Sequence, residues 1–165
     1  PASQPSSSQT GTTLVVFNND LDRVIASFVI ANGAVSMGKK VTMFFTFWGL
    51  NVLRKSKNKI RVKKNFIEKM FGKMMPKGSK KLSLSKMNMM GMGKKLIRSI
   101  MKKKNIESLE SMIQSAMQSG VELIACQMSM DVMGIKIEEL IDGVKVGGVA
   151  MYLEATENAG ANLFI

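Results

Sequence analysis

The sequence contains no histidine and a single cysteine, Cys126, among its 165 residues. These absences exclude a Cys/His zinc site, a Ser-His-Asp triad, a Cys-His dyad and an intramolecular disulfide. Any thiol chemistry therefore depends on Cys126 alone. A lone cysteine in a chain of this length also favours a reducing compartment, so we expect a cytoplasmic protein.

Long apolar runs and nucleotide-binding motifs are missing as well. No stretch reaches the roughly 18 consecutive apolar residues of a membrane span, and residues 1–11 have neither the basic nor the apolar part of a signal peptide. The Gly147-Gly148 pair belongs to neither a G-x-G-x-x-G nor a G-x-x-x-x-G-K-[ST] motif. We therefore predict no membrane span, no signal peptide, no metal and no cofactor.

Acidic residues are scarce in one part of the chain. Residues 54–104 contain nineteen Lys and Arg but one acid, Glu68, whereas the rest contains five basic and eleven acidic residues. The net charge of +12 therefore belongs to one segment and says little about the fold. We interpret residues 54–104 as a basic, methionine-rich insertion in a single domain at 13–165, preceded by a low-complexity leader or linker at 1–12.

The remaining sequence alternates short apolar runs with helical patterns. Buried strands are expected at 13–18, 41–45 and 121–125, a short strand at 144–146 and a last strand at 161–165. Helices are expected at 21–37, from the cap residue Asn105 to about 119, at 127–133, at 136–141 and from Gly147 to about 158. This alternation predicts an α/β fold, a three-layer α/β/α sandwich on a mostly parallel five-stranded sheet, interrupted by a long basic helical insertion.

The insertion admits several interpretations. Apolar residues recur at helical spacing from Phe66 to Met75 among lysines, and residues 87–92 are dense in methionine. A helical hairpin that packs on its own domain or in an oligomer interface fits this pattern, and so does a basic amphipathic segment that binds an anionic membrane surface or a partner groove. Nucleic acid is a weaker hypothesis because the segment has no Tyr or Trp for base stacking. A methionine-rich copper site is the weakest.

Cys126 is the main candidate for chemistry. It ends a predicted strand, and ligands bind at the carboxyl ends of strands in parallel sheets. The backbone N–H groups of residues 127–129 can turn toward its sulfur and favour the thiolate, so we expect an accessible, ionised thiol. Without a second thiol, we predict attack on a sulfane sulfur or carriage of a persulfide. The competing interpretation is that Cys126 is a small hydrophobic packing residue.

Four stretches resemble the DsrE/DsrF-like sulfur-relay family. They are 125–134 (A-C-Q-M-S-M-D-V-M-G), 41–50 (V-T-M-F-F-T-F-W-G-L), 20–22 (D-L-D) and 31–34 (A-N-G-A). The resemblance is nearest to a peroxiredoxin-labelled branch, also found fused behind CoA-disulfide reductase and rhodanese-type modules. It implies a DsrEFH-like sandwich, a homo-oligomer, and a Cys126 that accepts sulfane sulfur as a persulfide and passes it to a TusA-like carrier or a rhodanese.

Our leading hypothesis is a cytoplasmic sulfur-trafficking protein, a sulfurtransferase or a persulfide carrier, with Cys126 as its catalytic residue. Residues expected to shape the substrate pocket are Asp20, Asn32, Phe47, Trp48, Gln127, Ser129, Asp131 and Gly147. The alternative hypothesis is a non-catalytic membrane-peripheral or scaffold protein that docks through residues 54–104, with Cys126 as mere packing. The sequence leaves open whether the chain is an enzyme.

Overall fold

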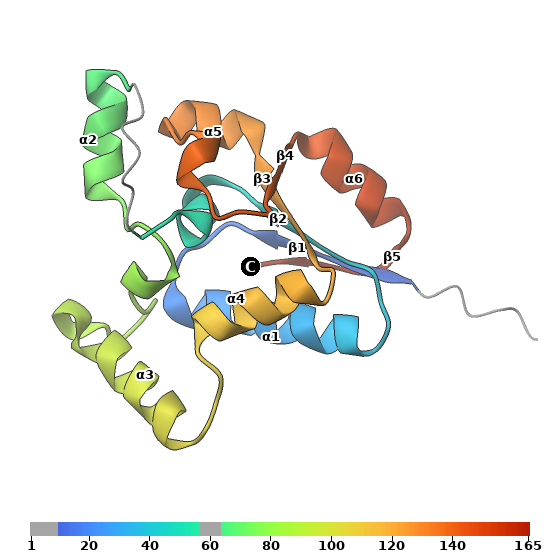
Figure 1. The fold of residues 1–165 in the computed structure, drawn as a ribbon, viewed down its shortest axis with the longest axis horizontal. Coiled ribbons are helices and arrows are strands. Elements are labelled where there is room, and N and C mark those ends of the chain that lie inside the picture. The colour runs from blue at the N-terminus through green and yellow to red at the C-terminus, as the bar shows by residue number, and fades with distance from the viewer. Residues whose placement is uncertain (1–9, 57–63) are drawn as a thin grey trace, which may run out of the picture.

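A single parallel sheet organises the molecule (Figure 1). The computed structural model describes residues 10–56 and 64–165. The strands are β1 Gly11–Val16, β2 Val41–Phe45, β3 Glu122–Cys126, β4 Lys145–Gly147 and β5 Ala159–Phe164. They lie in the order β4-β3-β2-β1-β5, and every neighbouring pair is parallel. The predicted α/β architecture on a five-stranded parallel sheet is confirmed.

Helices cover both faces of the sheet. The helices of the core are α1 Leu21–Ser36, α4 Leu109–Gln118, α5 Gln127–Met133 and α6 Val149–Glu157. α1 and α4 pack together on one face, and α6 lies on the other (Figure 1). The β1–β2 connection and the β4–β5 connection cross the sheet in opposite directions, so right-handed crossovers place α1 and α6 on opposite faces.

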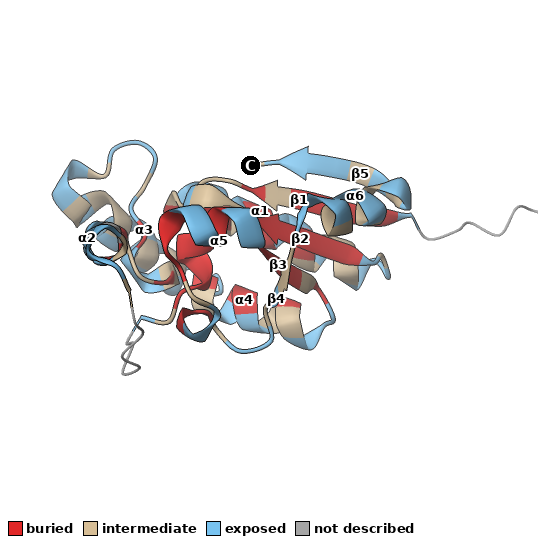
Figure 2. Ribbon diagram, turned by 90° about the horizontal axis from the view of Figure 1, so that it is seen from above, coloured by how far each residue is buried: buried red, intermediate tan, exposed pale blue. Residues whose placement is uncertain are grey.

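The two faces bury very different amounts of apolar surface. Because side chains alternate along a strand, Phe45 points toward α1 and α4 while Phe44 points toward α6. The α1 face holds the large core, which includes Leu14, Met43, Phe45 and Leu123. The α6 face holds a cluster of three buried residues, Phe44, Ile124 and Cys126, against which Met151 and Tyr152 pack. Figure 2 accordingly shows buried strands in the middle of the sheet and an exposed β5 and α6.

Several expected boundaries differ from the structure. The strand expected from residue 13 begins at Gly11, and residues 1–9 of the expected leader lie outside the described residues. The helix expected at 136–141 is a short 3-10 helix, Ile137–Glu139. The helix expected to start at Asn105 begins at Leu109, because Ser108 is the residue whose side chain caps it, accepting a hydrogen bond from the Ser111 N–H at 3.2 Å.

In its described residues the insertion contains the helices α2 Phe66–Met74 and α3 Met92–Lys103, separated by coil and 3-10 turns. Part of it belongs to the core, since Met75 and Leu82 are buried. Leu82 also lies next to a backbone connection, in which the Leu21 N–H donates to the Ser83 carbonyl at 2.7 Å. Residues 57–63 lie outside the described residues.

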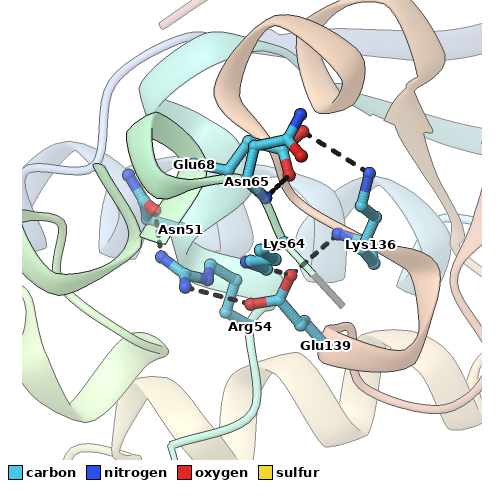
Figure 3. A network of polar contacts seen from close by, with 7 residues as sticks. All are labelled: Asn51, Arg54, Lys64, Asn65, Glu68, Lys136 and Glu139. Atoms are coloured by element: carbon cyan, nitrogen blue, oxygen red, sulfur yellow. Dashed lines mark hydrogen bonds and ion pairs between the residues drawn. The ribbon is translucent and has the colours of Figure 1, made fainter. Parts of the chain in front are cut away.

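A buried carboxylate, Glu139, holds the beginning of the insertion (Figure 3). Its Oε1 atom lies 3.2 Å from Arg54 Nη2, and its Oε2 atom lies 2.6 Å from Lys64 Nζ. Arg54 and Glu139 are almost fully buried. Arg54 and Lys64 are therefore held by one shared buried acid.

A second contact fixes α2 itself. Glu68 lies 3.6 Å from Lys136 Nζ and accepts a hydrogen bond from the Asn65 N–H at 3.0 Å (Figure 3). A side chain at Gly134 would collide with Glu68, which shows how closely α2 approaches the end of α5.

In the described part of the chain, no helix is both long and apolar enough to span a bilayer.

Candidate functional site

Cys126 stands at the junction of β3 and α5, at the carboxyl edge of the sheet. It is the last residue of β3 and occupies the cap position before α5. It pairs in register with Gly147 of β4, and its neighbour Ala125 pairs with Phe45 of β2. The predicted position of the cysteine at the end of a strand and before a short helix is confirmed.

The expectation of an accessible thiol is wrong for this conformation. Cys126 has 5% of its surface exposed and lies in the cluster formed by Phe44 and Ile124, with Met151 and Tyr152 of α6 packed against it. Sequence position placed the residue at the edge, but strand alternation turns its side chain onto the face that α6 covers. Within the described residues, Cys126 Sγ also makes no capping hydrogen bond to α5, so the expected N–H contacts are not formed.

Gly147 lies beside Cys126, and the packing explains why it is a glycine. A Cβ atom there would collide with the Met151 sulfur and lie 3.3 Å from Ile124 Cγ2. The missing side chain lets the start of α6 approach the sheet directly above Cys126. Gly147 thus adjoins the candidate site through its backbone.

Three predicted site residues lie on α5. Ser129 is fully buried, and its Oγ lies 2.7 Å from Thr46 Oγ1, which follows β2. Gln127 Nε2 donates to Asp131 Oδ1 at 3.0 Å on the exposed side of the helix. Ser129 therefore fixes α5 to the end of β2, while Gln127 and Asp131 form a polar pair at the surface near Cys126.

Phe47 and Trp48 follow β2 and line the same edge. Phe47 has a left-handed backbone, with φ of 47°, and its ring packs against Phe17 at a centroid distance of 5.7 Å. Trp48 is exposed. Both residues stand at the end of a strand adjacent to β3, as expected.

Asp20 and Asn32 are not brought to Cys126. Asp20 is the residue before α1 and follows β1, two strands away from β3 and hence about 10 Å across the sheet. It lies 3.6 Å from Arg23. Asn32 lies far along α1, on the opposite face of the sheet, where its Nδ2 donates to the Met112 carbonyl of α4 at 3.0 Å. The expectation that Asn32 lines the pocket is corrected: it joins two helices.

Met151 and Tyr152, which cover the thiol, are not among the residues expected from the sequence. Tyr152 stacks on Phe44 at a centroid distance of 5.3 Å. Tyr152 is the only tyrosine of the chain, but nothing local indicates which face of the sheet its helix covers. Among the residues described, no group of three or more Asp, Glu or Cys side chains is placed to hold a metal ion.

Comparison with known proteins agrees with this architecture. Residues 8–164 match the DsrE/DsrF/DrsH-like family, and the chain belongs to this family. It is 51% identical to the uncharacterized protein YrkE of Bacillus subtilis (strain 168), over 93% of this chain and 96% of that protein. It is 31% identical to the sulfur carrier protein DsrE2 of Allochromatium vinosum, over 92% and 96% of the two chains. The assignment to the peroxiredoxin-labelled branch stays a prediction.

Two solved structures share the fold. A protein of unknown function, MTH1491 from Methanobacterium thermoautotrophicum, superposes with a TM-score of 0.56 at 14% identity, covering 93% of this chain and 98% of that chain. The ychN protein from E. coli superposes with a TM-score of 0.51 at 11% identity, covering 94% and 99%. At these identities the likeness concerns the fold.

Proposed function

We propose that this chain is a sulfur-trafficking protein in which Cys126 accepts a sulfane sulfur and passes it on. The observation that carries the proposal is the position of the only thiol, at the carboxyl edge of the sheet where β3 meets α5. The similarity to a sulfur carrier, DsrE2, supports it further. With no second cysteine in the chain, the sulfur must leave to an external acceptor.

The proposed transfer uses one thiol and involves no net oxidation. The Cys126 thiolate attacks the outer sulfur of a donor persulfide, so that a new S–S bond forms at Sγ and the donor's S–S bond breaks, releasing the donor thiolate. An acceptor thiolate then attacks the outer sulfur of the Cys126 persulfide and restores the Cys126 thiolate. A TusA-like or rhodanese-like protein would supply that acceptor. The rate at which Cys126 passes its sulfur to the acceptor distinguishes the two forms of the proposal, a catalytic sulfurtransferase and a persulfide carrier.

Access to Cys126 requires movement of α6. Each of the nine residues of α6 is described, and none of them is buried. At Gly148, the residue before the helix, an added Cβ would meet nothing within 4 Å. Shifting Met151 and Tyr152 away from the sulfur uncovers the cluster of Phe44, Ile124 and Cys126 but leaves the larger core on the other face in place, so local opening costs less than unfolding.

We further propose that the protein is located in the cytoplasm and forms a homo-oligomer. In the cytoplasm, reducing conditions keep Cys126 as a thiol between transfers. A homo-oligomer is supported by exposed apolar side chains on α6 and the edge strand β5, at Val149, Leu153 and Phe164. Light scattering coupled to size-exclusion chromatography tests this part, and a monomer at all concentrations would contradict it.

Mass spectrometry tests the central claim. The purified chain is incubated with polysulfide or thiosulfate, and we expect a mass increase of one sulfur atom, located on Cys126 by digestion under non-reducing conditions. Adding an acceptor thiol should remove this sulfur. Because no other cysteine exists, Cys126→Ser provides a background free of thiol. An unmodified wild-type protein, or equal modification of Cys126→Ser, would rule the proposal out.

A further inference from the structure

The outer face of α3 exposes an apolar row flanked by lysines. Met92, Leu96 and Ile100 are four residues apart, so they lie on one side of the helix, and all three are exposed. Leu96 has 61% of its surface exposed. At 100° per residue, the exposed neighbours of this row are Lys95, Lys102 and Lys103.

The opposite side of α3 contacts the core. These contacts fix the rotation of the helix about its axis, so the apolar row points away from the core. Arg98 Nη1 lies 3.1 Å from Glu110 Oε2 of α4, and Arg98 Nη2 donates to the Ser79 carbonyl at 2.8 Å. Met101 packs against the large apolar core. The apolar row of α3 is therefore exposed while the opposite side of the helix is attached.

α2 repeats this construction. Phe66, Met70 and Met74 also occur at intervals of four, and Phe66 has 81% of its surface exposed. The exposed lysines beside this row are Lys69 and Lys73. Glu68, on the other side of α2, is the residue bound to Lys136 (Figure 3). Each helix thus has an attached polar side and an exposed apolar row.

Both rows lie at one end of the molecule. In Figures 1 and 2, α2 and α3 project together from the end toward which the strands run. The segment between them, which includes the 3-10 helix Met89–Gly91, adds three exposed methionines, Met87, Met89 and Met90. Residues 64–104 contain thirteen basic residues and one acid. The end formed by α2, residues 87–90 and α3, here called the basic end, therefore combines exposed apolar side chains with positive charge.

This combination fits an anionic bilayer better than a nucleic acid. Amphipathic helices that lie in a membrane interface carry apolar rows edged by cations, which bind acidic headgroups. Twelve of the thirteen basic residues in 64–104 are lysines, and the one arginine, Arg98, is already bound to Glu110. Base recognition depends on arginine forks, and exposed Leu, Ile and Met rows contribute nothing to phosphate contacts.

We infer that the basic end docks the protein on an anionic phospholipid surface, with the apolar rows of α2 and α3 inserted among the headgroups. In this orientation the carboxyl edge of the sheet faces the bilayer. The inference is independent of sulfur transfer at Cys126. It requires both parts of the surface: lysines to attract the protein and apolar side chains to hold it.

Flotation with the full chain tests both parts. Vesicles of phosphatidylcholine alone are compared with vesicles that also contain phosphatidylglycerol, and we expect binding to the second kind only. Leu96→Gln with Ile100→Gln keeps good helix formers but removes the row, and should weaken binding at least about tenfold. The matched control is Val29→Gln with Ile30→Gln, an exposed apolar pair on α1, which should bind like wild type.

A charge-reversal pair tests the electrostatic part. Lys95→Glu with Lys102→Glu should also weaken binding at least about tenfold, and added salt should do the same to wild type. Lys39→Glu with Lys40→Glu, which precede β2 at the opposite end of the sheet, changes the net charge equally and should retain binding. Circular dichroism confirms the fold of every variant.

Equal binding to both vesicle types would overturn the inference. So would unchanged binding in the α3 variants, or binding that the control pairs reduce as much as the α3 pairs. A chain that stays off all vesicles but binds single-stranded RNA also overturns it and favours nucleic acid. Persulfide formation on Cys126 can be measured in each variant, so failure of docking and failure of sulfur transfer are distinguishable.

Discussion

The apolar cores on the two faces of the sheet differ in size, and this difference explains on which face a buried thiol can become accessible. Under α1 and α4, residues such as Phe45 and Leu123 belong to a core of many fully buried side chains. Under α6, three buried residues including Cys126 are covered by a helix that itself has no buried residue among its nine described positions. Stability resides on one face, and the candidate thiol lies on the face that can open at lower cost.

Adjacent phenylalanines of β2 give the sharpest test of this contrast. Phe45→Ala is expected to lower the free energy of unfolding by about 4 kcal/mol, because Phe45 is fully buried and stacks on Phe28 at 6.2 Å. Phe44→Ala should cost about 2 kcal/mol, because its cover, Tyr152, is partly exposed. Urea denaturation measures both, and equal losses would show that the faces are equally important for stability.

The insertion is held by charge as well as by apolar contact, which extends the comparison to Glu139. Glu139→Gln should destabilise the protein by about 3 kcal/mol, because Arg54 and Lys64 would lose their shared carboxylate in a buried place. The neighbouring Glu138 is exposed, so Glu138→Gln should change stability by less than about 0.5 kcal/mol. Equal effects of the two substitutions in urea denaturation would contradict the role of Glu139.

Acid should weaken the same attachment. Burial raises the pKa of Glu139, but hydrogen bonds from the Lys136 N–H and Lys64, with the charges of Lys64 and Arg54, outweigh burial and hold the pKa below its ordinary value of 4.5. A lowered pKa stabilises the fold above the ordinary value, and this contribution is lost as pH falls from 4.5 through the folded-state pKa.

Wild-type stability is therefore expected to fall below pH 4.5, and Glu139→Gln should show a weaker fall. The pKa of Glu110 is also lowered, because hydrogen bonds from Arg98 and Ser79 and the Arg98 charge outweigh its burial, so some acid sensitivity should persist in the variant. Urea midpoints measured across this range check both statements. An identical pH dependence in wild type and variant would exclude Glu139 as a source.

The smallest expected effect concerns the cover of Cys126. Tyr152→Ala should raise the rate of Cys126 alkylation by iodoacetamide about fivefold or more, which corresponds to about 1 kcal/mol of easier opening. Glu157→Ala is the matched control, because Glu157 is exposed on the same helix and belongs to neither the cover of Cys126 nor the exposed apolar side chains of α6. Equal labelling rates in the two variants would show that α6 does not limit access to the thiol.

Local signals predicted much of the fold. The expected strand at 41–45 coincides with β2, and the expected helix at 127–133 coincides with α5. Both follow from short-range patterns of apolar residues and turn formers. The incorrect prediction that Asn105 caps the next helix also follows from a local pattern. Asparagine is common both at helix caps and in left-handed turns, and Asn105 adopts the left-handed turn, with φ of 55°, just after α3.

Contacts between distant residues escaped prediction. Arg54 and Glu139 are 85 residues apart, and nothing near either of them indicates a buried ion pair. Asn32 was expected at the site, but its amide is used by Met112, 80 residues away. Such pairs depend on how helices and strands pack, which the local pattern does not contain.

By itself, the sequence determined that any thiol chemistry involves Cys126, that this residue ends a strand, and that positive charge is concentrated in 54–104, because composition and short periods are properties of the chain alone. Only the tertiary structure decided that α6 covers Cys126 and that the apolar rows of α2 and α3 remain exposed at one end. Strand order and crossover direction assign each helix to a face, and that assignment emerges only when the whole sheet is assembled.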